Sequence, residues 1–162
     1  MAIRIIEGPP GSGKTYYAVR PLAHTYFEKQ EDGRYELVKP CTLITNIDEF
    51  QPEHVSLQEA IREAGSANIF FTEPYQREFT SRFESQIIYI IDEAQRLFRK
   101  GTRVDKELSE VFFYFEYHRH LGHDIYLITQ NHKKLPLDLV VLTEYIISSA
   151  PRSRSVIGEF KY

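Results

Sequence analysis

The sequence is poor in cysteine, methionine and tryptophan, and it contains no long apolar run. Its 162 residues include one cysteine, one methionine and no tryptophan. A single cysteine, Cys41, excludes an intrachain disulfide, and its apolar neighbours at residues 42–45 predict that it is buried. No apolar stretch approaches the roughly 20 residues of a membrane-spanning helix, and no signal-peptide pattern is present. These absences favour a soluble, intracellular domain.

An excess of charge of one sign is also missing. Twenty Lys and Arg side chains stand against 23 Asp and Glu, which gives a net charge of −3. Bulk charge therefore does not attract a polyanion, and contact with nucleic acid would need a local basic patch. Hydrophobic residues make up 42% and charged residues 27%, as in ordinary globular proteins. Together with the length, this predicts a single α/β domain over residues 1–162.

Apolar runs alternate with amphipathic stretches along the chain. The run 87–91 (IIYII) is continuously apolar, which is typical of a central parallel strand buried on both faces. Ser56 and Glu59 form a capping-box pattern at the start of a helix. Residues 67–85 are the least regular, and we expect a short strand at 69–71 followed by an irregular insertion. Strands are predicted at 2–7, 42–47, 87–91, 124–130, 144–148 and 155–160, and helices from residue 14 onward and at 56–64, 105–121 and 136–142. This alternation predicts a three-layer α/β/α fold with a mainly parallel sheet.

Residues 8–15 read GPPGSGKT and fit the phosphate-binding pattern G-x-x-x-x-G-K-[ST]. Glycines let the backbone curl so that successive N–H groups converge on phosphate oxygens, and the following helix adds its positive end. Lys14 is expected to reach the β- and γ-phosphates, and the Thr15 hydroxyl to ligate Mg²⁺. A chance glycine-rich turn is the alternative, but the motif follows a predicted strand and opens a predicted helix. The predicted nucleotide-binding residues are Gly8, Pro9, Pro10, Gly11, Ser12, Gly13, Lys14, Thr15 and Tyr16.

Polar side chains follow two of the predicted strands. Asp92 comes directly after the run 87–91 and is expected to ligate Mg²⁺, partly through water. Glu93 is placed to orient or deprotonate an attacking water, unless it only caps or pairs in the turn. Gln130 is either a sensor of the γ-phosphate or a polar strand end that meets solvent. The adjacent Asp and Glu favour hydrolysis over phosphoryl transfer to a small molecule.

An arginine is the remaining part of many such sites. NTPases that work as rings often complete the site with an arginine from a neighbouring subunit. The candidates are Arg119, Arg152 and Arg154, although most arginines are merely solvated. We prefer Arg119, because it lies at the end of a helix that leads into the strand of Gln130.

His118, His120 and His123 invite a metal-site hypothesis. Their spacing of i, i+2 and i+5 does not share one helical face, and no partner with ligand spacing lies beside them. We therefore interpret them as structural or hydrogen-bonding histidines.

A basic run follows the Asp-Glu pair. It is either a solvated connection or a surface, for instance lining a pore, that contacts nucleic acid or a negatively charged partner. Its members are Arg96, Arg99, Lys100, Arg103 and Lys106.

Three blocks together resemble the N-terminal domain of the zonular occludens toxin (Zot) family, which includes the assembly ATPases of filamentous phages. They are residues 8–19 (GPPGSGKTYYAV), 90–98 (IIDEAQRLF) and 118–130 (HRHLGHDIYLITQ). The first block is common to P-loops in general, whereas the second and third are more specific. The strand 42–47, with Asn46, also resembles the family's second strand.

The resemblance implies a cytoplasmic ATPase at the cytoplasmic face of the bacterial inner membrane. It would act as an oligomeric, ring-forming motor that extrudes filamentous virions, with phage coat proteins and the DNA-coating protein complex as partners. The family's motifs transfer to Lys14, Thr15, Asp92, Glu93 and Gln130, and ATP as the nucleotide rests on the resemblance alone. Arg119 lies in the matching block 118–130, but the resemblance assigns no role to it.

One departure from the family concerns the membrane. Family members usually continue into a transmembrane helix and a periplasmic tail, and the sequence ends at Tyr162 without either. Attachment to the membrane would then need a further segment or a partner.

Two other functional classes stay open. A nucleotide-dependent scaffold would bind ATP and hardly hydrolyse it. A small-molecule or nucleotide kinase would be expected to have an arginine-rich lid and an acceptor pocket, and the pair Asp92 and Glu93 argues against it.

Overall fold

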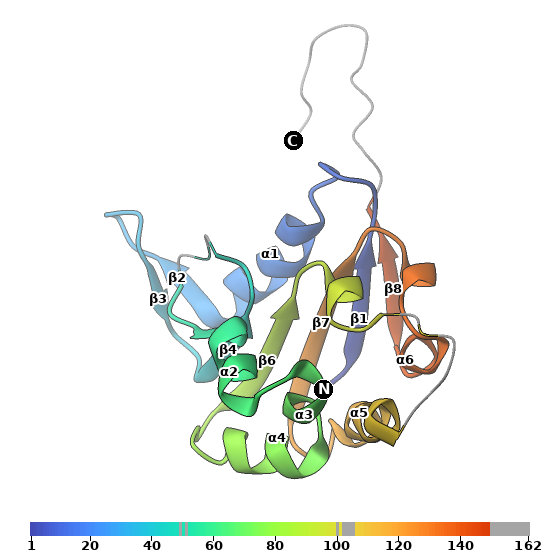
Figure 1. The fold of residues 1–162 in the computed structure, drawn as a ribbon. Helices are drawn as coiled ribbons and strands as arrows, with labels where there is room; N and C mark the ends of the chain where they lie inside the picture. Colours follow the sequence, from blue (N-terminus) through green and yellow to red (C-terminus); the bar gives the residue numbers. More distant parts are fainter. Residues whose placement is uncertain (49, 51, 100, 102–105, 150–162) are drawn as a thin grey trace, which may run out of the picture.

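Six parallel strands form the central sheet of the protein (Figure 1). The structure is a computed structural model that describes residues 1–48, 50, 52–99, 101 and 106–149. The strands lie in the order β5-β4-β6-β7-β1-β8, and each neighbouring pair is parallel. Their bounds are β1 Ile3–Glu7, β4 Cys41–Thr45, β5 Val55–Ser56, β6 Gln86–Ile91, β7 His123–Thr129 and β8 Tyr145–Ser148. The predicted mainly parallel sheet is confirmed.

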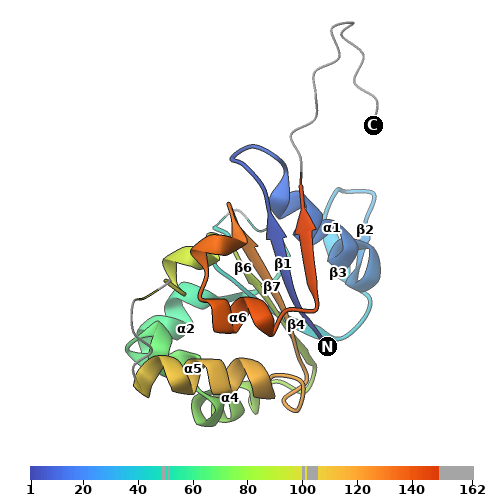
Figure 2. The ribbon, with the colours of Figure 1, turned by 90° about the vertical axis from the view of Figure 1, so that its right-hand side faces the viewer.

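Helices cover both faces of this sheet (Figure 2). One face carries α1 and the hairpin β2–β3, and the other face carries α2 to α6. The side chains of β6 alternate between the two layers: Ile88 and Ile90 pack with Leu22 of α1, whereas Ile87 and Tyr89 pack in the opposite cluster. The bounds are α1 Lys14–Tyr26, β2 Phe27–Lys29, β3 Tyr35–Leu37, α2 Leu57–Ala64, α3 Ala67–Phe70, α4 Glu73–Thr80, α5 Lys106–Tyr117 and α6 Leu137–Val141. The predicted three-layer α/β/α arrangement is confirmed.

The prediction for residues 67–85 is wrong. Instead of a strand at 69–71 and an irregular insertion, the chain forms α3 and α4. Ser66 starts α3, because its hydroxyl accepts a hydrogen bond from the Ile69 N–H. Phe70 and Phe71 are fully buried, and their rings contact Phe79 and Tyr89 respectively. Aromatic residues favour strands in isolation, but here their burial between helices and sheet decides the conformation.

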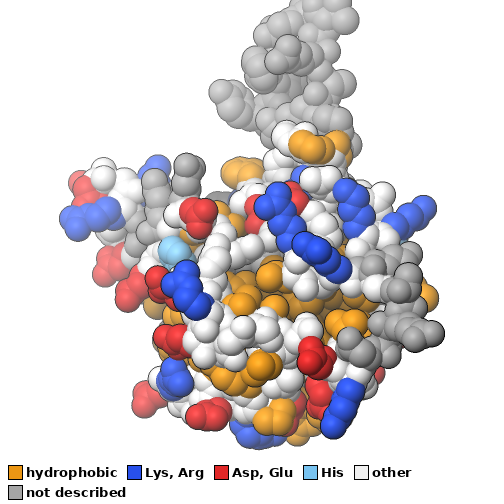
Figure 3. Space-filling model, viewed as in Figure 1, with side chains coloured by type: hydrophobic (Ala, Val, Ile, Leu, Met, Phe, Trp, Pro, Cys, Tyr) orange, Lys and Arg blue, Asp and Glu red, His pale blue; other side chains and the backbone are white. Residues whose placement is uncertain are grey.

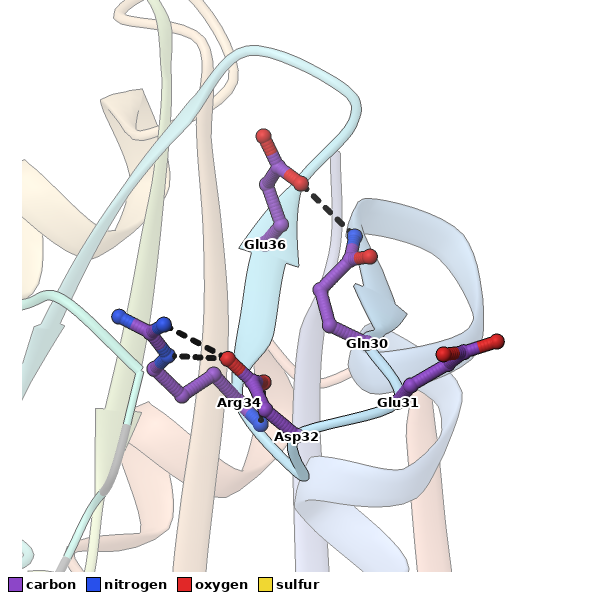
Figure 4. A pocket seen from close by; sticks show the side chains of 5 residues that line it. All are labelled: Gln30, Glu31, Asp32, Arg34 and Glu36. Carbon is purple, nitrogen blue, oxygen red and sulfur yellow. Dashed lines mark hydrogen bonds and ion pairs between the residues drawn. The ribbon is translucent and has the colours of Figure 1, made fainter.

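The segment after α1 differs from the prediction in a second way. The helix predicted from residue 14 onward ends at Tyr26, and the apolar Phe27, which continues its pattern, instead begins the hairpin β2–β3. The turn of this hairpin holds a shallow pocket lined by Gln30, Glu31, Asp32, Arg34 and Glu36 (Figure 4). Its side chains pair with one another, Arg34 with Asp32 and Gln30 with Glu36. We therefore regard it as a feature of the turn.

Most other predicted elements are present within about two residues of their expected bounds. Ser56 is the N-cap of α2 and accepts from the Glu59 N–H at 3.3 Å, as predicted. The main exception is α5, which ends at Tyr117 rather than near residue 121. The strand expected at 155–160 lies outside the described residues. Cys41 is buried, as predicted.

Candidate functional site

The phosphate-binding pattern forms the loop between β1 and α1. Gly11 and Gly13 adopt φ angles of 75° and 81°, in the left-handed region that favours glycine. The hydrogen bond from the Tyr17 N–H to the Gly13 carbonyl, 3.0 Å long, marks the first turn of α1. Tyr16, which belongs to that turn, is 57% exposed. The loop therefore presents the positive N-terminal end of a 13-residue helix at the carboxyl end of the sheet.

The base of this loop is tied to the end of β8. The Ser149 N–H donates to the Glu7 carbonyl at 2.7 Å, and the Ser149 hydroxyl lies 2.7 Å from the Ser12 hydroxyl. A Cβ atom at Gly8 would lie 2.4 Å from the Ser149 carbonyl oxygen, so only glycine fits this approach. Sequence reasoning missed Ser149, because nothing in its neighbourhood marks it as part of the loop's support.

Glu7, immediately before the loop, is held by a second set of contacts. Its carboxylate accepts from the His132 backbone N–H at 2.8 Å and from the Ser148 hydroxyl at 3.0 Å, and it pairs with the His132 ring at 2.8 Å. Burial by itself would raise the pKa of Glu7, but the hydrogen bonds to His132 and Ser148 outweigh burial and lower it. The end of β1 is therefore fixed by an ionised carboxylate beneath the loop.

The loop and the end of β6 meet through Thr15 and Asp92. The Thr15 hydroxyl donates to a carboxylate oxygen of Asp92 across 3.3 Å. Mg²⁺ in nucleotide sites is typically held by a hydroxyl, one or two carboxylates, phosphate oxygens and water, and these two side chains fit that donor set. Among the described residues no three His, Cys, Asp or Glu side chains cluster to hold a metal on their own. Lys14 is buried, and its ammonium donates to the Pro9 carbonyl at 3.0 Å.

Asn46, at the end of β4, clamps the backbone of Asp92. Its amide nitrogen donates to the Asp92 carbonyl at 2.8 Å, and its amide oxygen accepts from the Asp92 N–H at 2.7 Å. One oxygen of the Asp92 carboxylate also accepts from the Glu93 N–H at 2.7 Å. Both the position and the direction of the Asp92 carboxylate are thus determined by hydrogen bonds.

Glu93 sits in a sharp turn after β6. Its φ of 49° and ψ of 44° are left-handed, and it is the only described non-glycine residue with a positive φ. The carboxylate accepts from the Gln95 amide and lies 3.9 Å from the Arg96 guanidinium. Both partners belong to η1 (Ala94–Arg96), the short 3-10 helix that follows.

The order of the strands places β7 between β1 and β6. The end of β7 therefore lies between the phosphate loop and the pair Asp92 and Glu93. Gln130 follows this end, and its side-chain oxygen accepts from the Lys134 ammonium at 3.0 Å. Lys134 belongs to η2 (His132–Lys134).

Arg119 lies at the other end of the sheet. It follows α5 and precedes β7, so it is on the amino side of the strands, where it pairs with Glu144. Glu144 in turn accepts from the backbone N–H of Ile3, the first residue of β1. The helix α5 leads into the amino end of β7, whereas Gln130 follows the carboxyl end of this strand. Arg119 does not join the site of its own chain, and a role at a neighbouring subunit stays a prediction. Arg152 and Arg154 lie outside the described residues.

The three histidines do not form one site. His118 and His123 are buried, and His120 stacks on the Tyr117 ring at 4.6 Å. The Tyr114 hydroxyl lies 3.0 Å from Nδ1 of His123. Burial, with a smaller contribution from the neighbouring His118, lowers the pKa of His123 to about 4. The His118 and His123 side chains are packed into the core beneath α5, whereas His120 is exposed.

Basic side chains lie on the same half of the protein as the phosphate loop, in the view of Figure 1, and others lie on the lower half. Figure 3 shows Lys and Arg side chains on the upper half of this face, the half on which the loop lies in Figure 1. Arg96 and Arg99 of the predicted basic run are exposed, as is Lys106, which starts α5. Lys100 and Arg103 lie outside the described residues. Contact with nucleic acid stays a prediction.

A model of the family described as zonular occludens toxin (Zot) matches residues 2–160. The chain belongs to this family. No curated protein matches the sequence.

Two solved structures share the fold of this chain. The N-terminal domain of the zonular occludens toxin from Neisseria meningitidis is 25% identical, with a TM-score of 0.62 over 89% of this chain and 74% of that one. The genome packaging NTPase B204 from Sulfolobus turreted icosahedral virus 2, in complex with ATP-gammaS, is 20% identical, with a TM-score of 0.57 over 91% of this chain and 73% of that one. The Zot-family chain therefore has the fold of P-loop NTPases. Within its described part, no helix combines the length and apolar character needed to cross a bilayer.

Proposed function

We propose that this Zot-family chain, as a single domain over residues 1–162, binds ATP with Mg²⁺ and hydrolyses it. The observation that carries the proposal is the meeting of Thr15 and Asp92, 3.3 Å apart, with Glu93 next to them. Two segments 77 residues apart in sequence thus supply a hydroxyl, a metal-binding carboxylate and a second carboxylate to one place. The B204 structure with ATP-gammaS, a nucleotide complex on the same fold, supports this choice of ligand.

Each residue has a role that follows from its chemistry. The N–H groups of residues 8–15 and the start of α1 hold the phosphates, and Lys14 exchanges the Pro9 carbonyl for phosphate oxygens. Thr15 and Asp92 hold Mg²⁺, which offsets phosphate charge when it is bound. Glu93 accepts the proton of the attacking water, and Gln130 contacts the γ-phosphate. The alternative of a kinase gains no support from these residues.

The biological role proposed here is a motor of filamentous phage assembly and export. It is supported by membership of the Zot family and by a fold shared with a genome packaging NTPase. The motor would work as a homo-oligomeric ring at the cytoplasmic face of the inner membrane, on phage coat proteins and the DNA-coating protein complex. An arginine from the neighbouring subunit would complete each site.

Steady-state ATP hydrolysis with Mg²⁺, measured over a range of protein concentrations, tests the proposal. We expect turnover to rise more than linearly with concentration and to be lost in Glu93→Gln, because that change removes the base and keeps the shape. Lys14→Ala should abolish ATP binding itself. ATP binding with negligible turnover at every concentration would refute hydrolysis and favour the scaffold. A phosphorylated small-molecule acceptor would instead identify a kinase.

A further inference from the structure

The carboxylate of Glu93 is held from one side by Gln95. The Gln95 amide nitrogen donates to Oε2 of Glu93. Within the described residues nothing donates to the other oxygen, Oε1, which is the atom left to accept a proton. A glutamate side chain has three rotatable bonds, so a base on a surface turn needs such a restraint to keep one orientation.

The orientation of the Gln95 amide is itself set by Thr129. The Thr129 hydroxyl donates to the Gln95 side-chain oxygen at 2.6 Å, and Thr129 is fully buried at the end of β7. An ionised carboxylate only accepts hydrogen bonds, so the NH₂ group must face Glu93 and the carbonyl must face Thr129. The chain of hydrogen bonds therefore runs in one direction, from Thr129 through Gln95 to Glu93.

Arg96 is a weaker candidate for the same role. Its guanidinium lies 3.9 Å from the Glu93 carboxylate, beyond hydrogen-bond distance, and its side chain is 79% exposed. Solvent screens an ion pair of this kind, so it contributes little to the position of either group. Gln95, anchored on a buried strand end, is the partner that fixes Glu93.

We propose that Gln95 is a positioning residue, which holds Glu93 in the orientation that activates water and couples it to the end of β7. The proposal rests on the proposed hydrolysis. Because Gln130 follows Thr129 directly, a contact between Gln130 and the γ-phosphate would act on the same strand end that orients the base. Loss of Gln95 should slow the chemical step and leave nucleotide binding intact.

Gln95→Met tests this, because methionine keeps the length of the side chain and removes both hydrogen bonds. We expect kcat for ATP to fall about 10- to 100-fold, part of the 10²- to 10⁴-fold that a positioned base supplies, while KM stays within twofold. Thr129→Val should lower kcat less than Gln95→Met does. Thr129→Ser keeps the hydroxyl, so its kcat should be close to that of the unmodified chain. Gln30→Met, on the exposed hairpin turn, is the matched control and should leave kcat unchanged.

Gln95→Glu adds a readout that a merely structural role would not move. At neutral pH the introduced carboxylate repels Glu93 and donates nothing, so kcat is low. As pH falls and the introduced carboxyl becomes protonated, it can donate to Glu93, and kcat relative to the unmodified chain should rise. A kcat of Gln95→Met within twofold of the unmodified chain, or a loss confined to KM, overturns the proposal.

A measurement without turnover separates this proposal from the proposed function. In ¹⁵N–¹H spectra of the full chain, the Gln95 side-chain NH₂ signals are those that vanish in Gln95→Met. They should move in Glu93→Ala, and an unchanged position would show that the hydrogen bond is not formed. If the unmodified chain does not turn over ATP, the proposed hydrolysis fails, and these spectra alone decide whether Gln95 holds Glu93.

Discussion

Replacing Gly8 by alanine tests how closely the end of β8 is fitted against the phosphate loop. The added Cβ would lie 2.4 Å from both the carbonyl oxygen and the hydroxyl oxygen of Ser149, and 2.6 Å from the Ser12 hydroxyl. The hydroxyls can turn away only by losing their hydrogen bond to each other, and the Ser149 backbone is tied to Glu7. Overpacking of a tight site costs about 1–3 kcal/mol and a lost hydrogen bond about 1 kcal/mol. We expect Gly8→Ala to lower the free energy of unfolding by about 3 kcal/mol.

Urea and thermal unfolding measure this loss, which corresponds to a fall in Tm of about 6–12 °C for a chain of this size. Gly33→Ala is the control: Gly33 has φ of +84° and no atom within 4 Å of an added Cβ. Its cost is the left-handed backbone alone, about 1–2 kcal/mol. Adding Ser149→Ala to Gly8→Ala should restore only part of the stability, because the backbone carbonyl remains. A cost at Gly8 no larger than that at Gly33 would refute the argument.

Three further changes test other parts of the molecule. The pKa of His123 is about 4 in the folded chain and about 6.5 in the unfolded chain, so the unfolded chain binds more protons between these pH values. The free energy of unfolding should therefore be fully present above pH 6.5 and fall by about 3 kcal/mol toward pH 4, with a shallower fall in His123→Gln. A urea midpoint that does not depend on pH would contradict this. Asn46→Ala removes two hydrogen bonds to the Asp92 backbone, so it should lower the free energy of unfolding in urea by about 1–3 kcal/mol and weaken Mg²⁺-dependent ATP binding. An unchanged free energy of unfolding would show that these two hydrogen bonds are unimportant. Thr15→Val removes the hydroxyl that is expected to ligate Mg²⁺, so the affinity for ATP should lose most of its dependence on the metal. Titration with ATP, with and without Mg²⁺, measures this dependence. Full retention of it would exclude Thr15 as a ligand.

The three-layer fold and the phosphate loop were predictable because their determinants are local. Gly8, Lys14 and Thr15 lie within eight consecutive residues, and the run 87–91 is apolar without interruption before Asp92. Backbone conformation at glycines, helix capping and burial of a continuous apolar strand depend on neighbours in sequence. These patterns therefore predicted the right elements before any contact was known.

Residues 67–85 show where local patterns fail. Aromatic side chains there favour a strand by propensity, yet the chain forms two helices, because Phe70 and Phe71 are buried against the sheet and α5. Local propensity is a weak preference of at most about 1 kcal/mol per residue, whereas burial of a large side chain contributes about 1.5–3 kcal/mol. Tertiary packing prevails in such a segment.

Local sequence patterns were enough to predict the phosphate loop, the alternation of strands and helices, and the residues that can carry the chemistry. The order of the strands in the folded sheet puts β7 between β1 and β6, which places Gln130 between the loop and Glu93 and Arg119 at the remote end of the sheet. The contacts that Asn46, Gln95 and Ser149 make around the site could not be predicted from local patterns, because their partners lie 34 to 142 residues away. Parallel strands pair across long connections, and no local periodicity encodes their order, so the side chains that meet at the end of the sheet are decided only when it assembles.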